Sequence, residues 1–275
     1  MKQGFVKVAS ATPGIRVADP VYNARAICTQ AKEAAEHGAK IIVFPELCIT
    51  GYTCNDLFLQ NLLLKKAKEA LLTIAEETSR LGALLFVGLP VEKDGRLYNV
   101  AAAVYRGSIL GMIPKKNIPT YAEFYEGRYF TPGEERITNF RLGEYEVPFG
   151  TNLLFCCEEL PELVLGCEIC EDLWVADPPS TFHALAGATV IANLSASNET
   201  VSKDAYRELL VKSTSARLLC GYIYTSAGEG ESTQDLVFGG HNLIAENGTL
   251  LAQSSRFATG IIYTDLDVLK ISSER

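Results

Sequence analysis

Long apolar runs are missing from this 275-residue sequence. None approaches the roughly 18 residues of a membrane-spanning helix, and the N-terminus has no apolar stretch like the core of a signal peptide. An excess of basic residues is missing as well, because the formal net charge is −8, whereas nucleic-acid binders normally carry a basic patch. We therefore expect a cytoplasmic protein with neither a membrane nor a nucleic-acid partner.

Histidine is scarce, with three residues, and the eight cysteines contain only one Cys-x-x-Cys pair. That pair, Cys167 and Cys170, is compatible with redox chemistry or with half of a zinc site. Because a zinc site needs four ligands and no second pair occurs, we expect no metal. A cysteine-protease pairing of Cys170 with His183 or His241 has no local signature, so both histidines are interpreted as structural.

Strand-like and helix-like segments alternate along the chain, which predicts an α/β fold with helices covering sheet faces. No linker or low-complexity segment divides residues 1–275, so we expect a single domain. Residues 114–133 have little periodicity and are predicted to form a functional loop. Residues 238–266 are predicted to form hairpins around Asn247-Gly248 and near Ser255. The predicted strands are 5–9, 40–44, 83–87, 99–105, 153–157, 163–170, 188–194 and 221–225, and the predicted helices are 21–35, 56–81, 180–186 and 203–218.

Three side chains suited to acyl transfer each follow a buried strand. Glu46 comes after an apolar run, and burial of a carboxylate raises its pKa toward the range of a general base. Cys170 also ends a strand, where a neighbouring base can activate its thiol, and Lys115 is suited to stabilising an oxyanion. Taken singly, these residues also fit a structural ion pair, an inert thiol and a solvated lysine.

The three segments resemble the nitrilase superfamily over nearly the whole chain. The resemblance is carried by Phe-Pro-Glu at 44–46, Pro-Lys at 114–115 and Glu-Ile-Cys-Glu-Asp at 168–172, in that order. It implies a four-layer α-β-β-α sandwich that assembles into a homodimer or a higher homo-oligomer.

The same resemblance implies roles for the residues that carry it. Glu46 would be the general base, Cys170 the nucleophile and Lys115 the oxyanion-stabilising group. Glu123 resembles the second glutamate that supports the lysine, with Glu126 as the alternative.

Further segments narrow the resemblance to the N-terminal glutaminase domain of bacterial glutamine-dependent NAD synthetases. These segments are Gly-Tyr at 51–52, Asn-Asp-Leu-Phe at 55–58, residues 120–126 and Asn-Leu-Ser-Ala-Ser at 193–197. The implied reaction hydrolyses L-glutamine to glutamate and supplies ammonia to a C-terminal synthetase domain, which amidates deamido-NAD. The implied glutamine pocket is formed by Tyr121, Phe124, Glu171, Ser197 and Lys203, with Tyr52 as a further candidate.

The nucleotide-binding motifs of that second domain do not occur here. The sequence has neither a Gly-x-x-x-x-Gly-Lys-Ser/Thr loop nor a Ser-Gly-Gly-x-Asp-Ser loop. We therefore expect no cofactor in this chain, with ATP and Mg²⁺ belonging to the synthetase domain. A piece of a longer protein is favoured over a free-standing glutaminase.

Two other functions stay open. One is a stand-alone amidase of the superfamily that acts on another small amide or nitrile. The other is a non-catalytic domain of the same fold that serves dimerisation or regulation, against which the intact Glu46, Lys115 and Cys170 argue.

Overall fold

The computed structural model describes residues 3–275, so residues 1 and 2 of the predicted domain lie outside the described part. One group of strands is β1 (Phe5–Thr12), β2 (Ile41–Val43), β3 (Leu84–Lys93), β4 (Arg96–Tyr105), β5 (Ser108–Pro114), β6 (Thr138–Leu142), β7 (Tyr145–Phe149) and β14 (Gly260–Asp267). The other group is β8 (Phe155–Cys156), β9 (Val164–Ile169), β10 (Val190–Ser195), β11 (Gly221–Ser226), β12 (Leu243–Glu246) and β13 (Thr249–Gln253). The helices are α1 (Pro20–Glu36), α2 (Asn61–Glu77), α3 (Pro179–Leu185), α4 (Lys203–Leu218) and α5 (Val268–Ser273), with short 3₁₀ segments η1 (Tyr52–Leu59), η2 (Glu126–Arg128) and η3 (Cys170–Leu173).

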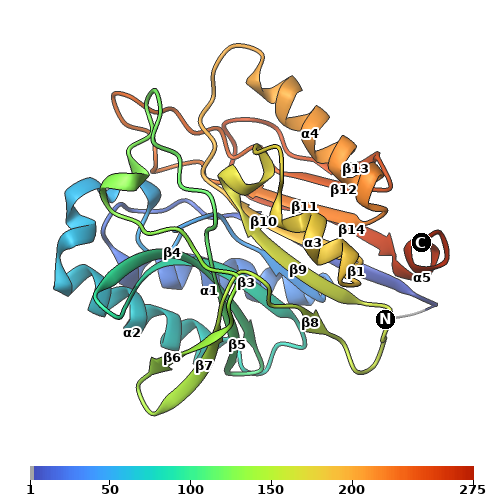
Figure 1. Cartoon of the computed structure of the whole chain (residues 1–275), viewed down its shortest axis with the longest axis horizontal. Helices are drawn as coiled ribbons and strands as arrows, with labels where there is room; N and C mark the ends of the chain where they lie inside the picture. The colour runs from blue at the N-terminus through green and yellow to red at the C-terminus, as the bar shows by residue number, and fades with distance from the viewer. Residues whose placement is uncertain (1–2) are drawn as a thin grey trace.

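These elements form four layers (Figure 1). The first sheet has eight strands in the order β14-β1-β2-β3-β4-β5-β7-β6, and the second has six in the order β13-β12-β11-β10-β9-β8. Helices α1 and α2 cover the outer face of the first sheet, and α3 and α4 cover that of the second. The predicted α-β-β-α sandwich is confirmed.

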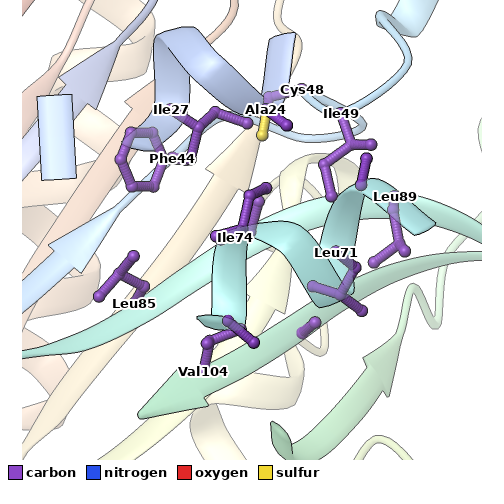
Figure 2. Packing of buried hydrophobic residues seen from close by; sticks show 14 of the residues in the cluster. Ala24, Ile27, Phe44, Cys48, Ile49, Leu71, Ile74, Leu85, Leu89 and Val104 are labelled. Atoms are coloured by element: carbon purple, nitrogen blue, oxygen red, sulfur yellow. The ribbon is translucent and has the colours of Figure 1, made fainter. Parts of the chain in front are cut away.

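Strand β3 illustrates how the layers are held together. Its side chains alternate between the two faces of the sheet, as a pleated strand requires. Leu85 and Leu89 face the helical layer and pack in one cluster with Ile27 of α1 and Ile74 of α2 (Figure 2). Phe86 faces the other way and belongs to the cluster between the two sheets. Side chains on the two faces of this one strand therefore pack against two different layers.

The predicted turn at Asn247-Gly248 is present, and Asp94-Gly95 forms another between β3 and β4. Both residues of each pair have positive φ, at 45° and 83° and at 52° and 72°, as tight hairpin turns require. The predicted pairing near Ser255 is wrong, because the chain there leaves β13 and crosses to the first sheet. Strand β14 pairs with β1 in antiparallel register along its whole length. The segment near Ser255 has the composition of a hairpin turn, but it connects one sheet to the other.

Two helices differ in detail from their predictions. The helix predicted from residue 56 begins at Asn61, because Gln60 is extended with φ −95° and ψ 120°. Helical spacing places Tyr206 and Leu209 together on one face of the helix predicted at 203–218, but in α4 that face is exposed, and Arg207 and Val211 are buried instead. Among residues 3–275 no helix is both long enough and apolar enough to cross a membrane.

The strand directions gather four strand ends at one edge of the sandwich. Strands β1, β2 and β3 are parallel, as are β9, β10 and β11. Strand β5 is antiparallel to β4, which is itself antiparallel to β3, so β5 runs the same way as β2. Because the carboxyl ends of such strands are where α/β proteins bind ligands, the segments after β2, β5, β9 and β10 mark the candidate site.

Candidate active site

Glu46 lies just beyond β2 with its carboxylate fully buried. Its Oε1 accepts hydrogen bonds from Asn99 Nδ2 and Lys115 Nζ, both at 2.6 Å. Its Oε2 accepts one from the backbone N–H of Ala196 at 2.9 Å, just after β10. Elements of both sheets therefore hold this carboxylate in one orientation.

The turn that carries Glu46 depends on a close approach to β3. A Cβ atom on Gly88 would lie 2.3 Å from Leu47 N and 2.7 Å from Pro45 O, distances that atoms cannot adopt without a shift. Leu47 itself has a positive φ of 51°. The absence of a side chain at residue 88 lets the turn fold down onto the sheet and point Glu46 inward.

Lys115 follows β5 and is completely buried. Its Nζ donates to Glu46 Oε1 and to Glu126 Oε1, each at 2.6 Å. Burial lowers the pKa of Lys115, but the negative charges of Glu126 and Glu46 outweigh it and hold the pKa well above its ordinary value. The lysine is therefore cationic inside the protein.

Glu126 is the second carboxylate on this lysine, and it also accepts a hydrogen bond from Tyr52 Oη at 2.8 Å. Burial raises its pKa from 4.5 to about 7; the positive charge of Lys115 acts against this, and the charge of Glu46 adds to it. The expected contact between Glu123 and Lys115 is thereby corrected. Glu123 Oε1 instead accepts a hydrogen bond from Asn198 Nδ2 at 2.5 Å, because η2 turns Glu126 rather than Glu123 inward.

Cys170 begins η3 directly after β9, in a left-handed conformation with φ 44°. The residue is 7% exposed. Burial and the negative charge of Glu46 raise the pKa of this thiol far above its ordinary value, and the positive charge of Lys115 offsets this only in part. The resting cysteine is therefore a thiol, which must lose its proton to a neighbouring base in order to react.

Asp172 fastens the cysteine turn to the loop that carries Lys115. Its Oδ2 accepts from the backbone N–H of Ile169 at 3.0 Å, and its Oδ1 accepts from the backbone and side-chain nitrogens of Asn117, both at 2.8 Å. Figure 1 shows the loop after β5 passing beside the ends of β9 and β10. These hydrogen bonds therefore fix the position of the turn that carries Cys170 relative to the loop that follows Lys115.

A cavity of about 370 Å³ opens over Cys170. Glu171 lies on its wall and accepts hydrogen bonds from Tyr121 Oη at 3.0 Å to both carboxylate oxygens. Burial raises the pKa of Glu171. The structure brings five predicted pocket residues to this cavity, together with Cys170, Glu123 and Glu126: Tyr121, Phe124, Glu171, Ser197 and Lys203. It does not bring Tyr52 there, because the tyrosine hydroxyl is used on Glu126.

Sequence reasoning missed three residues that shape the site. Asn99 lies within strand β4, where no local signal marks a side chain directed at Glu46. Arg207 is fully buried and donates to Ser197 Oγ at 3.2 Å and to the carbonyl of Asn198 at 3.1 Å. Trp174 lines the cavity, and its place four residues after the nucleophile was the available signal.

The acidic, cysteine and histidine side chains of residues 3–275 do not cluster as metal ligands. No group of three or more histidine, cysteine, aspartate or glutamate side chains there is arranged to hold a metal ion. All eight cysteines are free thiols, and Cys167 is buried between the two sheets. The chemistry available from these residues is a thiol beside a carboxylate and a buried ammonium group.

Comparison with known proteins places this arrangement in a class. The carbon-nitrogen hydrolase family matches residues 7–274, and the chain belongs to that family. The predicted membership of the nitrilase superfamily is confirmed, and with it an enzyme of the carbon–nitrogen hydrolase type.

Particular relatives narrow the comparison. The chain is 45% identical to the glutamine-dependent NAD(+) synthetase of Mycobacterium tuberculosis over 276 residues, which is 100% of this chain and 41% of that protein. It superposes on a glutamine-dependent NAD(+) synthetase from Cytophaga hutchinsonii with a TM-score of 0.86 and 30% identity, over 95% of this chain and 43% of that one. An amidase from Nesterenkonia sp. shares the fold, with a TM-score of 0.74 and 21% identity over 100% of this chain and 96% of that one. The chain thus spans about two fifths of the length of the synthetases that it matches.

Proposed function

We propose that the chain hydrolyses L-glutamine to L-glutamate and ammonia through a thioester on Cys170. The observation that carries this proposal is the buried Glu46–Lys115–Glu126 group, which reaches through Glu126 a cavity that is also lined by Cys170, Glu171 and Lys203. The similarity to two glutamine-dependent NAD(+) synthetases supports the choice of glutamine.

The first step forms the thioester. Glu46 takes the proton of the Cys170 thiol, and the sulfur forms a bond to the side-chain amide carbon of glutamine. The carbonyl π electrons move to oxygen, and the resulting oxyanion is stabilised by Lys115. Glu46 then gives its proton to the amide nitrogen, the carbon–nitrogen bond breaks, and ammonia leaves while the oxyanion electrons re-form the carbonyl.

The second step consumes one water molecule. Glu46 removes a proton from the water, whose oxygen attacks the thioester carbonyl and forms a second oxyanion near Lys115. Collapse of this intermediate breaks the carbon–sulfur bond, and the thiolate of Cys170 recovers the proton held by Glu46. Glutamate leaves, and the enzyme returns to its starting protonation state.

Recognition of glutamine would come from its α-amino and α-carboxylate groups. Glu171 is suited to the α-ammonium group, because its carboxylate is half-buried and held by Tyr121. Lys203 is suited to the α-carboxylate. Such a pocket should reject amides that lack these charges, since they leave a buried charge without a partner.

We further propose that the ammonia serves a C-terminal synthetase domain, in which ATP and Mg²⁺ drive amidation of deamido-NAD, and that the protein forms a homodimer or a higher homo-oligomer. The support is the 41% share of the M. tuberculosis synthetase that this chain covers. An amidase acting on another small amide is the second candidate, supported by the shared fold of the Nesterenkonia amidase.

Intact-mass measurement with 6-diazo-5-oxo-L-norleucine tests both nucleophile and substrate. This glutamine mimic alkylates a nucleophilic thiol and loses dinitrogen. We expect one adduct on the parent chain, protection by L-glutamine but not by butyramide, and no adduct on Cys170→Ala. Labelling spread over several cysteines, or equal protection by both amides, would refute the glutaminase proposal. Cys156→Ala is the matched control, because Cys156 is an exposed thiol of β8 that pairs with Val164, at the opposite end of β9 from Cys170.

A further inference from the structure

Lys203 is held between two aromatic rings on the cavity wall. Its Nζ lies 5.2 Å from the ring centroid of Trp174 and 5.5 Å from that of Phe124. Trp174 is itself supported by Tyr206, whose ring centroid lies 5.3 Å away at an interplanar angle of 75°. A cation between aromatic faces is attracted by both rings, and more strongly where water is excluded.

A polar chain fixes the same ammonium group from another side. Lys203 Nζ donates to Asn198 Oδ1, and Asn198 Nδ2 donates to Glu123 Oε1 at 2.5 Å. The carbonyl of Asn198 accepts from buried Arg207 at 3.1 Å. Glu123 does not reach the catalytic lysine, but it orients the side-chain amide of Asn198 that accepts the hydrogen bond from Lys203.

Lysine is a poor carboxylate receptor without such support. Its flexible four-carbon stem must lose rotamer entropy to hold one position, and it lacks the planar fork with which arginine binds a carboxylate. Burial also lowers the pKa of Lys203, so the charged form needs neighbours that favour it. Two aromatic faces and a fixed carbonyl-type acceptor supply that environment.

We propose that Trp174 and the Glu123–Asn198 pair are positioning residues that hold Lys203 in place to bind the carboxylate at the far end of the substrate. This inference rests on the proposed function for the identity of that substrate. It assigns a task to Glu123 and to Trp174 that neither has in the acyl-transfer chemistry. Selectivity for a carboxylate-bearing amide then depends on residues outside the catalytic group.

The composition offers a direct probe, because Trp174 is the only tryptophan in the sequence. Its fluorescence emission therefore reports on the contact between Lys203 and the Trp174 ring in the absence of any ligand. We expect Lys203→Met to change the emission of Trp174, since it removes a cation next to the ring. Lys212→Met is the control on the same helix, where the lysine pairs with Glu208 at the surface.

Ligand binding is then measured by calorimetry on the Cys170→Ala protein, which cannot turn the substrate over. Three ligands are compared: L-glutamine, glutaric acid monoamide, which lacks the amino group, and 4-aminobutanamide, which lacks the carboxylate. Trp174→Leu and Asn198→Ala should each weaken the two carboxylate ligands about fivefold to twentyfold, the range that a desolvated cation–π contact implies. Binding of 4-aminobutanamide should stay the same, and Trp174→Phe should restore most of the loss. Asn139→Ala is the matched control, because this exposed amide also donates to a glutamate, Glu146.

The outcomes separate this inference from the proposed function. Equal weakening of all three ligands, or no weakening, would overturn the positioning role. If Lys203→Met left the emission of Trp174 unchanged, the proposed contact between Lys203 and the Trp174 ring would be refuted. Failure of the Cys170→Ala protein to bind L-glutamine, with the emission change still present, would instead refute glutamine as the substrate. It would also refute the assignment of Lys203 to a substrate carboxylate.

Discussion

Replacing Glu126 by glutamine would isolate the ionisation of one buried carboxylate. The pKa of Glu126 rises from 4.5 to about 7, first because the group is buried and also because Glu46 is close, although Lys115 acts in the opposite direction. The folded state therefore binds this proton more tightly than the unfolded state does. Stability from this group is complete below pH 4.5 and is lost as the pH rises through 7.

The size of this loss follows from the two pKa values. Each unit of pKa corresponds to about 1.4 kcal/mol, so the group lowers the free energy of unfolding by about 3 kcal/mol between pH 4.5 and neutral pH. In Glu126→Gln this slope disappears, while Oε1 still accepts from Lys115 and Glu46 still neutralises the lysine. Burial also raises the pKa values of Asp172 and Glu231, to about 6 and about 7. These two groups make the free energy of unfolding fall with rising pH in the parent and in Glu126→Gln alike.

Urea unfolding at pH 5 and at pH 7.5, followed by far-ultraviolet circular dichroism, measures the difference. We expect the parent chain to lose more stability over this interval than Glu126→Gln, by about 1–3 kcal/mol. Glu146→Gln, at an exposed carboxylate of β7, should leave the slope unchanged. Equal slopes in the parent and in Glu126→Gln would mean that Glu126 is ionised throughout, and the reasoning from burial would be refuted.

Three further changes probe the catalytic group. Glu46→Gln should lower kcat for ammonia release about 100-fold to 10,000-fold by removing the base, measured with a coupled ammonia assay, and activity near that of the parent would exclude this role. Lys115→Met should lower kcat about 100-fold or more with a smaller change in KM, because an oxyanion donor acts in the transition state; a loss confined to KM would contradict this. Gly88→Ala should reduce stability by about 1–3 kcal/mol in urea, since its Cβ would meet the backbone of Pro45 and Leu47, and an unchanged midpoint would contradict the close approach.

The main catalytic candidates were accessible from the sequence because each follows a buried strand. Runs such as residues 40–44 and 163–169 indicate strands by themselves, and parallel strand ends meet at one edge of a sheet. Their positions after such runs made Glu46, Lys115 and Cys170 candidates, and the resemblance of the three segments to the nitrilase superfamily selected them. The structure places the first two in direct contact at 2.6 Å.

The supporting residues were not accessible in this way. Asn99 reaches Glu46 from a position 53 residues along the chain, and nothing in a buried strand indicates which polar side chain meets a partner in a neighbouring loop. Choosing between Glu123 and Glu126 required the path of an aperiodic loop, since one short 3₁₀ turn decides which glutamate faces inward. The buried Arg207 was hidden because helical periodicity records apolar faces, whereas this helix buries a charge and exposes Leu209.

The hydrogen bonds of the catalytic group restrict the role that each atom can take. A lysine ammonium group has three N–H donors, and Lys115 uses two of them on Glu46 and Glu126, so one is left for an oxyanion. Oε1 of Glu46 accepts two hydrogen bonds and Oε2 accepts one among the residues that the structure describes. A carboxylate oxygen has two lone pairs, so Oε2 is the atom with capacity for the proton of Cys170. The same fixed contacts that bury these charges thus leave one donor for the substrate and one acceptor for the thiol.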